Sequence, residues 1–348
     1  MRFYLGEHRH YCGIDLHVRT MYLCIVNAHG KILLHRNMPT SPEAFLAATS
    51  RFRNGLVVAV ECMFTWYWIA DLCAEHQIPF ILGHALYIKA IHGGKVKNDR
   101  VDSKKLALLL RAGLFPMAYV YPSSMRATRD LLRRRLHFSR KRAELNVHVQ
   151  HINAQYNLPP MPGKLGVKRH RVEVVQRFTN PDVRRNVELN LAIMDTYDRL
   201  LLQLERHILK TAKVHDPDAV ESLLSVPGIG RILAMTILYE VCDIERFPRV
   251  QDFVSYCRLV KPQKESGGKI YGHSGKKIGN ANLRWAFGEA ATLFLRQNPE
   301  AKAYHARLKH KHGKGKALAV LAHKLGRAVY FILKRKRRFD MNKFFNNG

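Results

Sequence analysis

The sequence predicts an α/β N-terminal part, a pair of long helices in the middle and a mostly helical C-terminal part. In the first hundred residues, short apolar runs of strand length alternate with segments of helical periodicity. From about residue 122 to residue 214, glycine becomes scarce and helical spacing continues over long stretches. From about residue 218 onward the composition is again that of a folded domain. We therefore expect three parts, at residues 1–120, 121–215 and 216–348.

The chain is strongly basic. Of its 348 residues, 58 are Lys or Arg and 27 are Asp or Glu, which gives a formal net charge of +31. A surface this positive repels itself and is typical of proteins that bind a polyanion. A membrane span would need about 18 or more consecutive apolar residues, and the sequence has no such run. The N-terminal segment has no apolar signal region, so we expect a cytoplasmic, nucleoid-associated protein whose partner is nucleic acid.

The first hundred residues are expected to form a sheet with helices. Three strand-length runs come first, at Tyr11–Leu16, Met21–Val26 and Lys31–Asn37, and the turn signal Asn27–Gly30 separates the last two. Ser41 then caps a helix that opens with Pro42. The elements expected after it are a buried strand at Leu56–Glu61, a helix at Trp68–Glu75, a strand at Pro79–Leu82, and helices at Ala85–Ile91 and Val101–Ala112.

Two long helices are expected in the middle of the chain, at about Ser124–Asn157 and Pro181–Lys213, with a connector at Leu158–Arg171 that is rich in Pro, Gly and basic residues. Apolar residues at helical spacing in the second helix predict an antiparallel coiled-coil arm. The residues of this stripe are Leu189, Ala192, Ile193, Leu200, Leu204 and Ile208. The first helix carries a basic run that we expect to contact DNA phosphates, with a merely solvated face as the alternative. This run consists of Arg133, Arg134 and Arg135, and a second one follows at Arg140–Arg142.

Acidic residues are scarce, so their positions are informative. Asp15 ends a Gly-Ile-Asp strand and Glu61 ends the buried run LVVAVE, so we expect both at one edge of the sheet. Asp99 and Asp102 lie three residues apart at an expected helix start, where they share a face. Four clustered carboxylates need cations, and oxygen ligands favour Mg²⁺ or Mn²⁺, as in enzymes that cut phosphodiesters. The alternatives are a turn cap for Asp15, a satisfied buried acid for Glu61 and an N-cap for Asp99.

These motifs resemble those of one known family. GID at 13–15, VEC at 60–62 and KNDRVDSKKLA at 97–107 are similar to the motifs of the DEDD insertion-sequence transposases, which include the pilin-gene invertases and bridge-RNA-guided recombinases. The resemblance runs from about Tyr11 to Ala118 and resumes from about Ser222 to Phe331. It implies an RNase H-like (RuvC-like) N-terminal domain that holds magnesium on the four carboxylates, and a C-terminal transposase domain.

The second block of the resemblance contains Ser225-Val-Pro-Gly-Ile-Gly230, which has the pattern of a helix-hairpin-helix turn. In such a turn, Pro227, Gly228 and Gly230 let backbone N–H groups approach a DNA phosphate without reading the base sequence. An ordinary turn between two helices is the alternative. We therefore expect this turn to be a DNA contact.

A Gly-, Ser- and Lys-rich segment, residues 262–280, is expected to be a flexible loop between helices. Its local sequence gives little reason for so much flexibility unless a backbone passes close to it. The resemblance places Ser266 at the family's proposed nucleophilic serine, and Ser274 is its rival. A serine hydroxyl is a weak nucleophile until a base or a metal activates it, and the carboxylate–magnesium cluster is the natural activator. Lys264 and Lys269 are expected to bind the phosphate and steady its charge.

The sequence departs from the family pattern directly after Glu61. Many relatives carry a small Gly-containing turn there, whereas Cys62–Trp68 is bulky and aromatic. Phe64, Trp66 and Tyr67 are expected to pack in the core, and stacking on unpaired bases is the alternative. The basic run at residues 334–338 is expected to be a solvated, disordered end.

The combined expectation is a DNA transposase or site-specific recombinase. Ser266 attacks a scissile phosphate to form a transient phosphoserine link, and a second DNA end displaces the serine. Two DNA partners, donor and target, imply a homo-oligomer; the resemblance further implies a tetramer, an active site shared between subunits and a structured non-coding guide RNA. The alternatives are a DNA invertase, a Holliday-junction-resolvase-like nuclease that uses metal-activated water and, least expected, a non-enzymatic nucleic-acid-binding scaffold.

Overall fold

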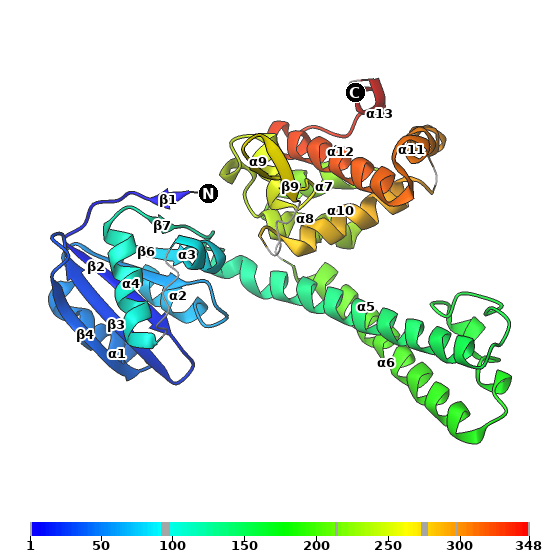
Figure 1. Ribbon diagram of the computed structural model, residues 1–348, viewed down its shortest axis with the longest axis horizontal. Helices are drawn as coiled ribbons and strands as arrows, with labels where there is room; N and C mark the ends of the chain where they lie inside the picture. Colours follow the sequence, from blue (N-terminus) through cyan, green and yellow to red (C-terminus); the bar gives the residue numbers. More distant parts are fainter. Residues whose placement is uncertain (1, 92–97, 213–214, 273–277, 297, 347–348) are drawn as a thin grey trace. The chain divides into compact units, whose positions relative to one another are not determined.

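The computed structural model divides into two compact units, residues 1–124 and 125–348 (Figure 1). It describes residues 2–91, 98–212, 215–272, 278–296 and 298–346. The first unit combines a β-sheet with helices, and the second is mostly helical.

Unit 1 is built on a mixed five-stranded sheet. Its strands are β2 (His10–Leu16), β3 (Thr20–Asn27), β4 (Ile32–Pro39), β5 (Leu56–Glu61) and β6 (Phe80–Gly83), and a separate pair is formed by β1 (Phe3–Tyr4) and β7 (Phe115–Pro116). The sheet order is β4-β3-β2-β5-β6, with β2 antiparallel to β3 and parallel to β5. β4 is antiparallel to β3, and β6 is parallel to β5. This mixed sheet is consistent with the expected RNase H-like domain.

Helices cover both faces of the sheet. They are α1 (Pro42–Thr49), α2 (Tyr67–Glu75), α3 (Ala85–Ile91) and α4 (Asp99–Arg111). On one face, Phe45 of α1 and Ile69 of α2 belong to the same buried cluster as Ile14 of β2. On the other face, Leu106 of α4 clusters with Tyr11 of β2. Successive residues of β2 therefore feed two different cores, as the alternation of side chains along a strand requires.

The backbone of α4 crosses β2 closely at Gly13. A Cβ atom at this position would lie 2.3 Å from the backbone nitrogen of Ala107 and 2.5 Å from the carbonyl oxygen of Ser103. Only a residue without a side chain lets the helix backbone come this near. Gly13 therefore fixes how closely α4, whose first turn carries Asp99 and Asp102, approaches the strand that ends near Asp15.

Two long helices, α5 (Ser123–Gln155) and α6 (Pro181–Thr211), lie side by side and run in opposite directions (Figure 1). Val149 of α5 shares a small buried core with Val187 of α6. Nearer the other end of the pair, the Arg135 guanidinium lies 2.6 Å from a carboxylate oxygen of Glu205. The expected helical arm is thus an antiparallel pair, whereas its coiled-coil packing stays a prediction.

The apolar stripe expected to pack in the coiled-coil arm lies mostly on the exposed face of α6. Leu189, Ile193 and Leu200 are exposed, as is Ala192, whereas Leu204 is half-buried and Ile208 is buried. The face of α6 that joins the small core instead carries Val187, Leu191 and Met194. Two faces of this helix carry apolar residues at helical spacing, so the sequence pattern alone did not identify the face that meets α5.

The remaining helices form one large core. They are α7 (Pro217–Leu224), α8 (Arg231–Val241), α9 (Val250–Tyr256), α10 (Ala281–Phe294), α11 (Pro299–His312), α12 (Lys314–Arg335) and α13 (Met341–Asn346). Two short strands, β8 (Lys264–Ser266) and β9 (Lys269–Gly272), pair as a hairpin. Tyr239, Phe253 and Phe287 are fully buried in the core. Among the helices that the structure describes, none is both long and apolar enough to cross a membrane.

The expectation of a disordered basic end is wrong. Lys334 and Arg335 end α12, and the chain then turns through Lys336, whose φ is 50°. Phe344 of α13 is only 5% exposed, and its ring centroid lies 5.4 Å from that of Phe294. The aromatic residues that follow the basic run anchor this end of the chain in the helical core.

A buried carboxylate ties three helices of unit 2 together. Glu240 of α8 is 1% exposed and lies 2.6 Å from Nε of Arg133 and 3.1 Å from Nη2 of Arg129 on α5. Asn280, the N-cap of α10, donates a hydrogen bond to it at 2.7 Å, and Asn282 donates another at 3.0 Å. Burial raises the pKa of Glu240, but its hydrogen bonds and the charges of the two arginines outweigh burial and lower the pKa below its usual 4.5.

Replacing Glu240 by Gln should destabilise unit 2 by roughly 3–5 kcal/mol, because it leaves buried arginine charge without its carboxylate partner. The free energy of unfolding from urea titrations measures this loss. Glu245→Gln is the matched control, since its side chain is 67% exposed and its ion pair with Lys334 should contribute at most about 1 kcal/mol. Equal losses in both variants would contradict the assignment.

The Glu240 network also predicts a pH dependence. Because the pKa is lower in the folded chain than in the unfolded chain, its contribution is fully present above about pH 4.5 and is lost as the pH falls through the lowered pKa. As the pH falls through that range, the melting temperature of the Glu240→Gln variant should therefore decrease less than that of the wild type. Thermal unfolding at a series of pH values measures the difference.

Replacing Gly13 by Ala should destabilise unit 1 by about 1–3 kcal/mol, because the added methyl group meets helix backbone that cannot swing aside. Calorimetric unfolding measures the change. In Gly288→Ala, where an added Cβ meets no atom within 4 Å inside α10, stability should instead rise by about 0.5–1 kcal/mol. A neutral Gly13→Ala variant would show that α4 is not held at this contact.

Candidate active site

Asp15 and Glu61 stand at the ends of neighbouring parallel strands. The register pairs Ile14 of β2 with Val60 of β5, so the next residue of each strand reaches the same edge of the sheet. Both acidic side chains are half-buried. The strand that carries Glu61 also pairs it with Gly83 of β6. The sheet therefore places these two carboxylates at one edge.

Asp99 and Asp102 lie in the first turn of α4. Asn98 caps this helix, because its side-chain oxygen accepts a hydrogen bond from the N–H of Val101 at 2.8 Å. The role of N-cap proposed as the alternative for Asp99 is therefore filled by its neighbour. His35 of β4 holds the same turn, since its Nε2 lies 2.9 Å from a backbone carbonyl oxygen there. Carboxylates in a first helical turn also interact favourably with the helix dipole.

His17, which was not expected at this site, lies between two of the carboxylates. Its Nε2 is 3.4 Å from Oδ2 of Asp15 and 3.5 Å from Oδ1 of Asp99. Ligand atoms of all three residues lie within 4.8 Å of one another. The spacing Asp-x-His at a strand end was the signal in the sequence. Two carboxylates and an imidazole form a donor set that suits a divalent transition metal, and Mg²⁺ through the oxygens.

The electrostatics of this edge favour a cation. Burial raises the pKa of Asp15, His17 lowers it, and the neighbouring charges of Asp99 and Asp102 raise it again. Asp102 is itself paired with Lys105, whose Nζ lies 3.2 Å from Oδ1. The compact three-residue group includes neither Asp102 nor Glu61. A bound cation would relieve the repulsion among the carboxylates.

The aromatic segment after Glu61 divides into core and surface. Trp66 is 5% exposed and belongs to the core beneath the sheet, and Tyr67 packs against the same core. The expectation of core packing is confirmed for these two. Phe64 is different, because 78% of it is exposed. The exposed ring of Phe64, three residues after Glu61, is accessible for stacking on an unpaired base.

Ser266 lies at the end of β8, in a hairpin rather than in the expected flexible loop. It pairs with Lys269 across a turn formed by Gly267 and Gly268, whose φ angles are 56° and 73°. A two-residue turn with both residues left-handed is the type I′ turn that glycine favours. The turn therefore supplies the local reason for glycine here that the sequence pattern did not reveal.

The hairpin leaves the serine accessible. Ser266 and Lys269 are both exposed. Lys264 begins β8, but its side chain lies outside the described part of the structure, and so does Ser274. The choice between the two serines therefore stays a prediction.

The segment that carries this hairpin begins and ends at one place. The N–H of Asn280 donates a hydrogen bond to the carbonyl oxygen of Tyr256 at 2.6 Å. Arg258 donates from Nε to the carbonyl oxygen of Ile278 at 2.8 Å. Asn280 is also bound to buried Glu240. The closed base of the serine segment is thus fixed to the helical core.

The turn between α7 and α8 has two glycines with different roles. A Cβ on Gly228, whose φ is 86°, would lie 2.6 Å from the backbone nitrogen of Phe294, so this glycine serves the packing of α10. Gly230 precedes α8 and has no atom within 4 Å of such a Cβ, and Pro227 is exposed beside it. At Gly228 the backbone that comes close is therefore that of the protein itself, whereas a DNA phosphate was expected there. Of the two glycines, only Gly230 faces open space.

The three arginines of α5 also differ. Arg133 is bound to Glu240 and Arg135 to Glu205, so both have partners inside unit 2. Arg134 is exposed, with its guanidinium 5.9 Å from the ring centroid of Phe138. Of the three, Arg134 is therefore the most available for a phosphate contact, which stays a prediction for all of them.

Comparisons with known proteins match both blocks of the chain. A family model described as a transposase, of the DEDD type of the IS110 group, matches residues 12–157. A second model, described as the transposase IS116/IS110/IS902 family, matches residues 220–306. The first match covers the strands and the helix that carry the carboxylates, and the second covers the serine hairpin.

Similar proteins extend over nearly the whole chain. The transposase for insertion sequence element IS1111A of Coxiella burnetii is 21% identical over 337 residues, which cover 94% of this chain and 90% of that protein. The transposase for insertion sequence element IS1328 of Yersinia enterocolitica is 24% identical, with 92% and 95% covered. A putative transposase of Sinorhizobium fredii is 28% identical over 58% of this chain and 49% of its own length.

The matched models occur in the order that the acidic edge and the serine hairpin follow along the chain, and the two longest of these alignments span both. The DEDD domain implies the use of a divalent metal, which agrees with the group of Asp15, His17 and Asp99. The chain therefore belongs to the DEDD-type insertion-sequence transposases of the IS110 group, enzymes that cleave and rejoin DNA.

Proposed function

We propose that the chain is the transposase of a mobile insertion sequence and exchanges DNA strands through a serine nucleophile and Mg²⁺. The observation that supports this most directly is the convergence of Asp15 and Asp99, from two different elements, around His17. Glu61 and Asp102 complete the acidic quartet, and Mn²⁺ is an acceptable substitute for Mg²⁺. The Asp15 and Asp99 oxygens, with His17 beside them, would hold the ion first.

The proposed reaction conserves phosphoester bonds. Ser266 Oγ bonds to the phosphorus of a scissile phosphodiester while its proton passes to a carboxylate of the quartet. The bond from phosphorus to one sugar oxygen breaks, and that oxygen takes up the proton and leaves as a hydroxyl. The hydroxyl of a second DNA end then attacks the phosphoserine and restores the serine. When bound, Mg²⁺ supplies positive charge that stabilises the developing charge on the phosphate. Lys264 and Lys269 in the hairpin, and Gly230 at the turn before α8, are the proposed DNA contacts.

The proposed assembly is a homo-oligomer that holds donor and target DNA together. The carboxylates and Ser266 lie in different units, so one chain's acidic edge can serve another chain's hairpin. A structured non-coding guide RNA that selects the two DNA sites is part of the proposal through the family alone, and the net charge of +31 is compatible with it. A DNA invertase would use the same chemistry on inverted sites.

A resolvase-like nuclease is the rival function. In that case the carboxylates activate water, and no covalent DNA–protein link forms. Ser266 is exposed at the end of β8, directly before the two-glycine turn, and this favours the serine route because the hydroxyl is accessible rather than buried.

Asp15→Asn should reduce plasmid recombination by at least about a hundredfold and weaken Mn²⁺ binding measured by calorimetry, because it removes a charged oxygen ligand. Asp182→Asn, an exposed acid in the first turn of α6, is the matched control and should retain both properties. Unchanged recombination in Asp15→Asn would rule out the metal assignment.

Ser266→Ala should abolish strand exchange and the covalent DNA–protein adduct that denaturing gels detect, while metal binding is retained. Ser255→Ala, also exposed in unit 2, should behave like the wild type. If Ser274→Ala loses the adduct and Ser266→Ala keeps it, the nucleophile is Ser274. Continued cutting by Ser266→Ala without any adduct would favour the resolvase-like alternative.

A further inference from the structure

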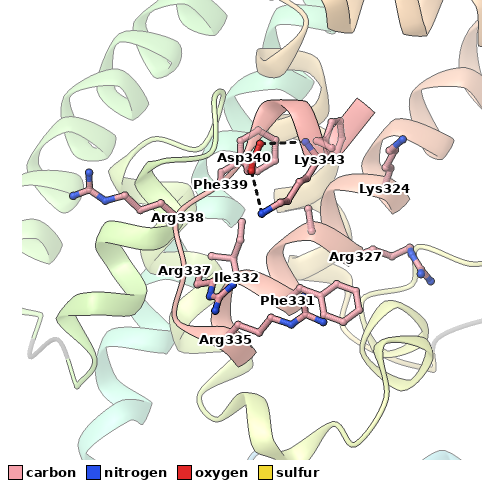
Figure 2. A pocket seen from close by; sticks show the side chains of 12 residues that line it. Lys324, Arg327, Phe331, Ile332, Arg335, Arg337, Arg338, Phe339, Asp340 and Lys343 are labelled. Atoms are coloured by element: carbon pink, nitrogen blue, oxygen red, sulfur yellow. Dashed lines mark hydrogen bonds and ion pairs between the residues drawn. The ribbon is translucent and has the colours of Figure 1, made fainter. Parts of the chain in front are cut away.

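A basic and aromatic pocket of about 390 Å³ lies between α12 and the folded-back end of the chain (Figure 2). Six cationic side chains and one carboxylate line it. The cationic residues are Lys324, Arg327, Arg335, Arg337, Arg338 and Lys343. None of them belongs to the acidic quartet or the serine hairpin, so the pocket is unexplained by the proposed chemistry.

Most of this positive charge is not neutralised within the protein. The lining carboxylate, Asp340, is already paired with Lys343, whose Nζ lies 3.4 Å from Oδ2 (Figure 2). Arg338 is paired with Glu221. In the part of the chain that the structure describes, three lining arginines have no carboxylate partner, namely Arg327, Arg335 and Arg337. Surplus cations gathered around a hollow favour an anionic ligand.

Aromatic carbon lies directly beside these cations. Phe331 is half-buried in the wall, and the guanidinium of Arg335 lies over its ring, 4.8 Å from the centroid (Figure 2). A ring and a guanidinium plane are the two surfaces on which proteins stack unpaired bases. The pocket therefore combines phosphate-binding and base-stacking groups.

The arrangement is held by packing. Buried Phe344 anchors α13, with its ring 5.3 Å from that of Phe339. The N–H of Phe339 donates a hydrogen bond to Oγ of Ser225 at 2.8 Å. The left-handed Lys336 ends α12 and directs Arg337 back along the helix, where its N–H bonds the carbonyl oxygen of Ile332 at 3.2 Å. These contacts hold the C-terminal segment, which forms the wall of the pocket opposite α12, in a fixed position.

We propose that this pocket binds one unpaired nucleotide of a single-stranded nucleic acid, with the phosphate held by Arg335 and Arg337 and the base stacked at Phe331. A hollow of this size admits a single nucleotide-sized group. A duplex keeps its bases stacked inside and would leave the aromatic wall uncovered. DNA and RNA strands share the required phosphate and base, so the chemistry selects for an unpaired strand.

The test measures binding of the full chain to fluorescein-labelled oligo-dT, oligo-U and a duplex of equal length by fluorescence anisotropy over a series of salt concentrations. Arg335→Ala/Arg337→Ala should weaken single-strand binding at least about tenfold. It should also make the log–log salt slope shallower by about 1.4, since each phosphate contact on a single strand contributes about 0.7. Phe331→Leu, which keeps the apolar bulk, should weaken it about tenfold with the slope unchanged.

The matched control is Arg199→Ala/Arg206→Ala, which removes two exposed cations from α6 and should leave single-strand affinity within about twofold. Loss with oligo-dT or with oligo-U identifies the strand, and either result supports the pocket. Equal losses in the control, or equal losses on the duplex, would overturn it in favour of general attraction by charge. These assays involve no strand exchange, so they can succeed or fail independently of Ser266 and the quartet.

Discussion

The close crossing of α4 over β2 at Gly13 is the constraint on which the acidic edge depends. The helix starts with two carboxylates and the strand ends with a third, so the distance between helix and strand decides whether these charges meet. A side chain at Gly13 would overlap the helix backbone. Close packing therefore brings like charges near one another. The resulting repulsion among the carboxylates favours binding of a cation at the site.

In the second unit, packing and buried hydrogen bonds fix the position of the exposed hairpin that carries Ser266. Its serine is carried on a short hairpin that has little core of its own, while the base of that hairpin segment is bound to the best-buried carboxylate network of the unit. Exposed Ser266 is therefore attached to a fixed part of the core. Surface turns that a rigid scaffold positions are common places for functional side chains. Of the three arginines of α5 that were predicted to contact DNA, Arg133 belongs to this network.

Much of the sheet could be predicted from the sequence, because strand-length apolar runs and turn signals are local features. The run Leu56–Glu61 is a strand with those bounds. The partners of side chains were harder to predict, because they depend on tertiary packing. His17 is two residues from Asp15, yet its role appears only when α4 brings Asp99 to the same place. The buried face of α6 was mispredicted because a second face of that helix also carries apolar residues at helical spacing. The folded-back C-terminal end was mispredicted because a basic run precedes the aromatic residues that pack in the core.

The closed base of the serine segment has an evolutionary consequence. Since Tyr256 and Asn280 already join its two ends, lengthening the segment costs only loop-closure entropy, about 0.6 kcal/mol for each doubling of its length. Relatives can therefore vary the length and composition of the stretch around the serine while the helical core stays the same.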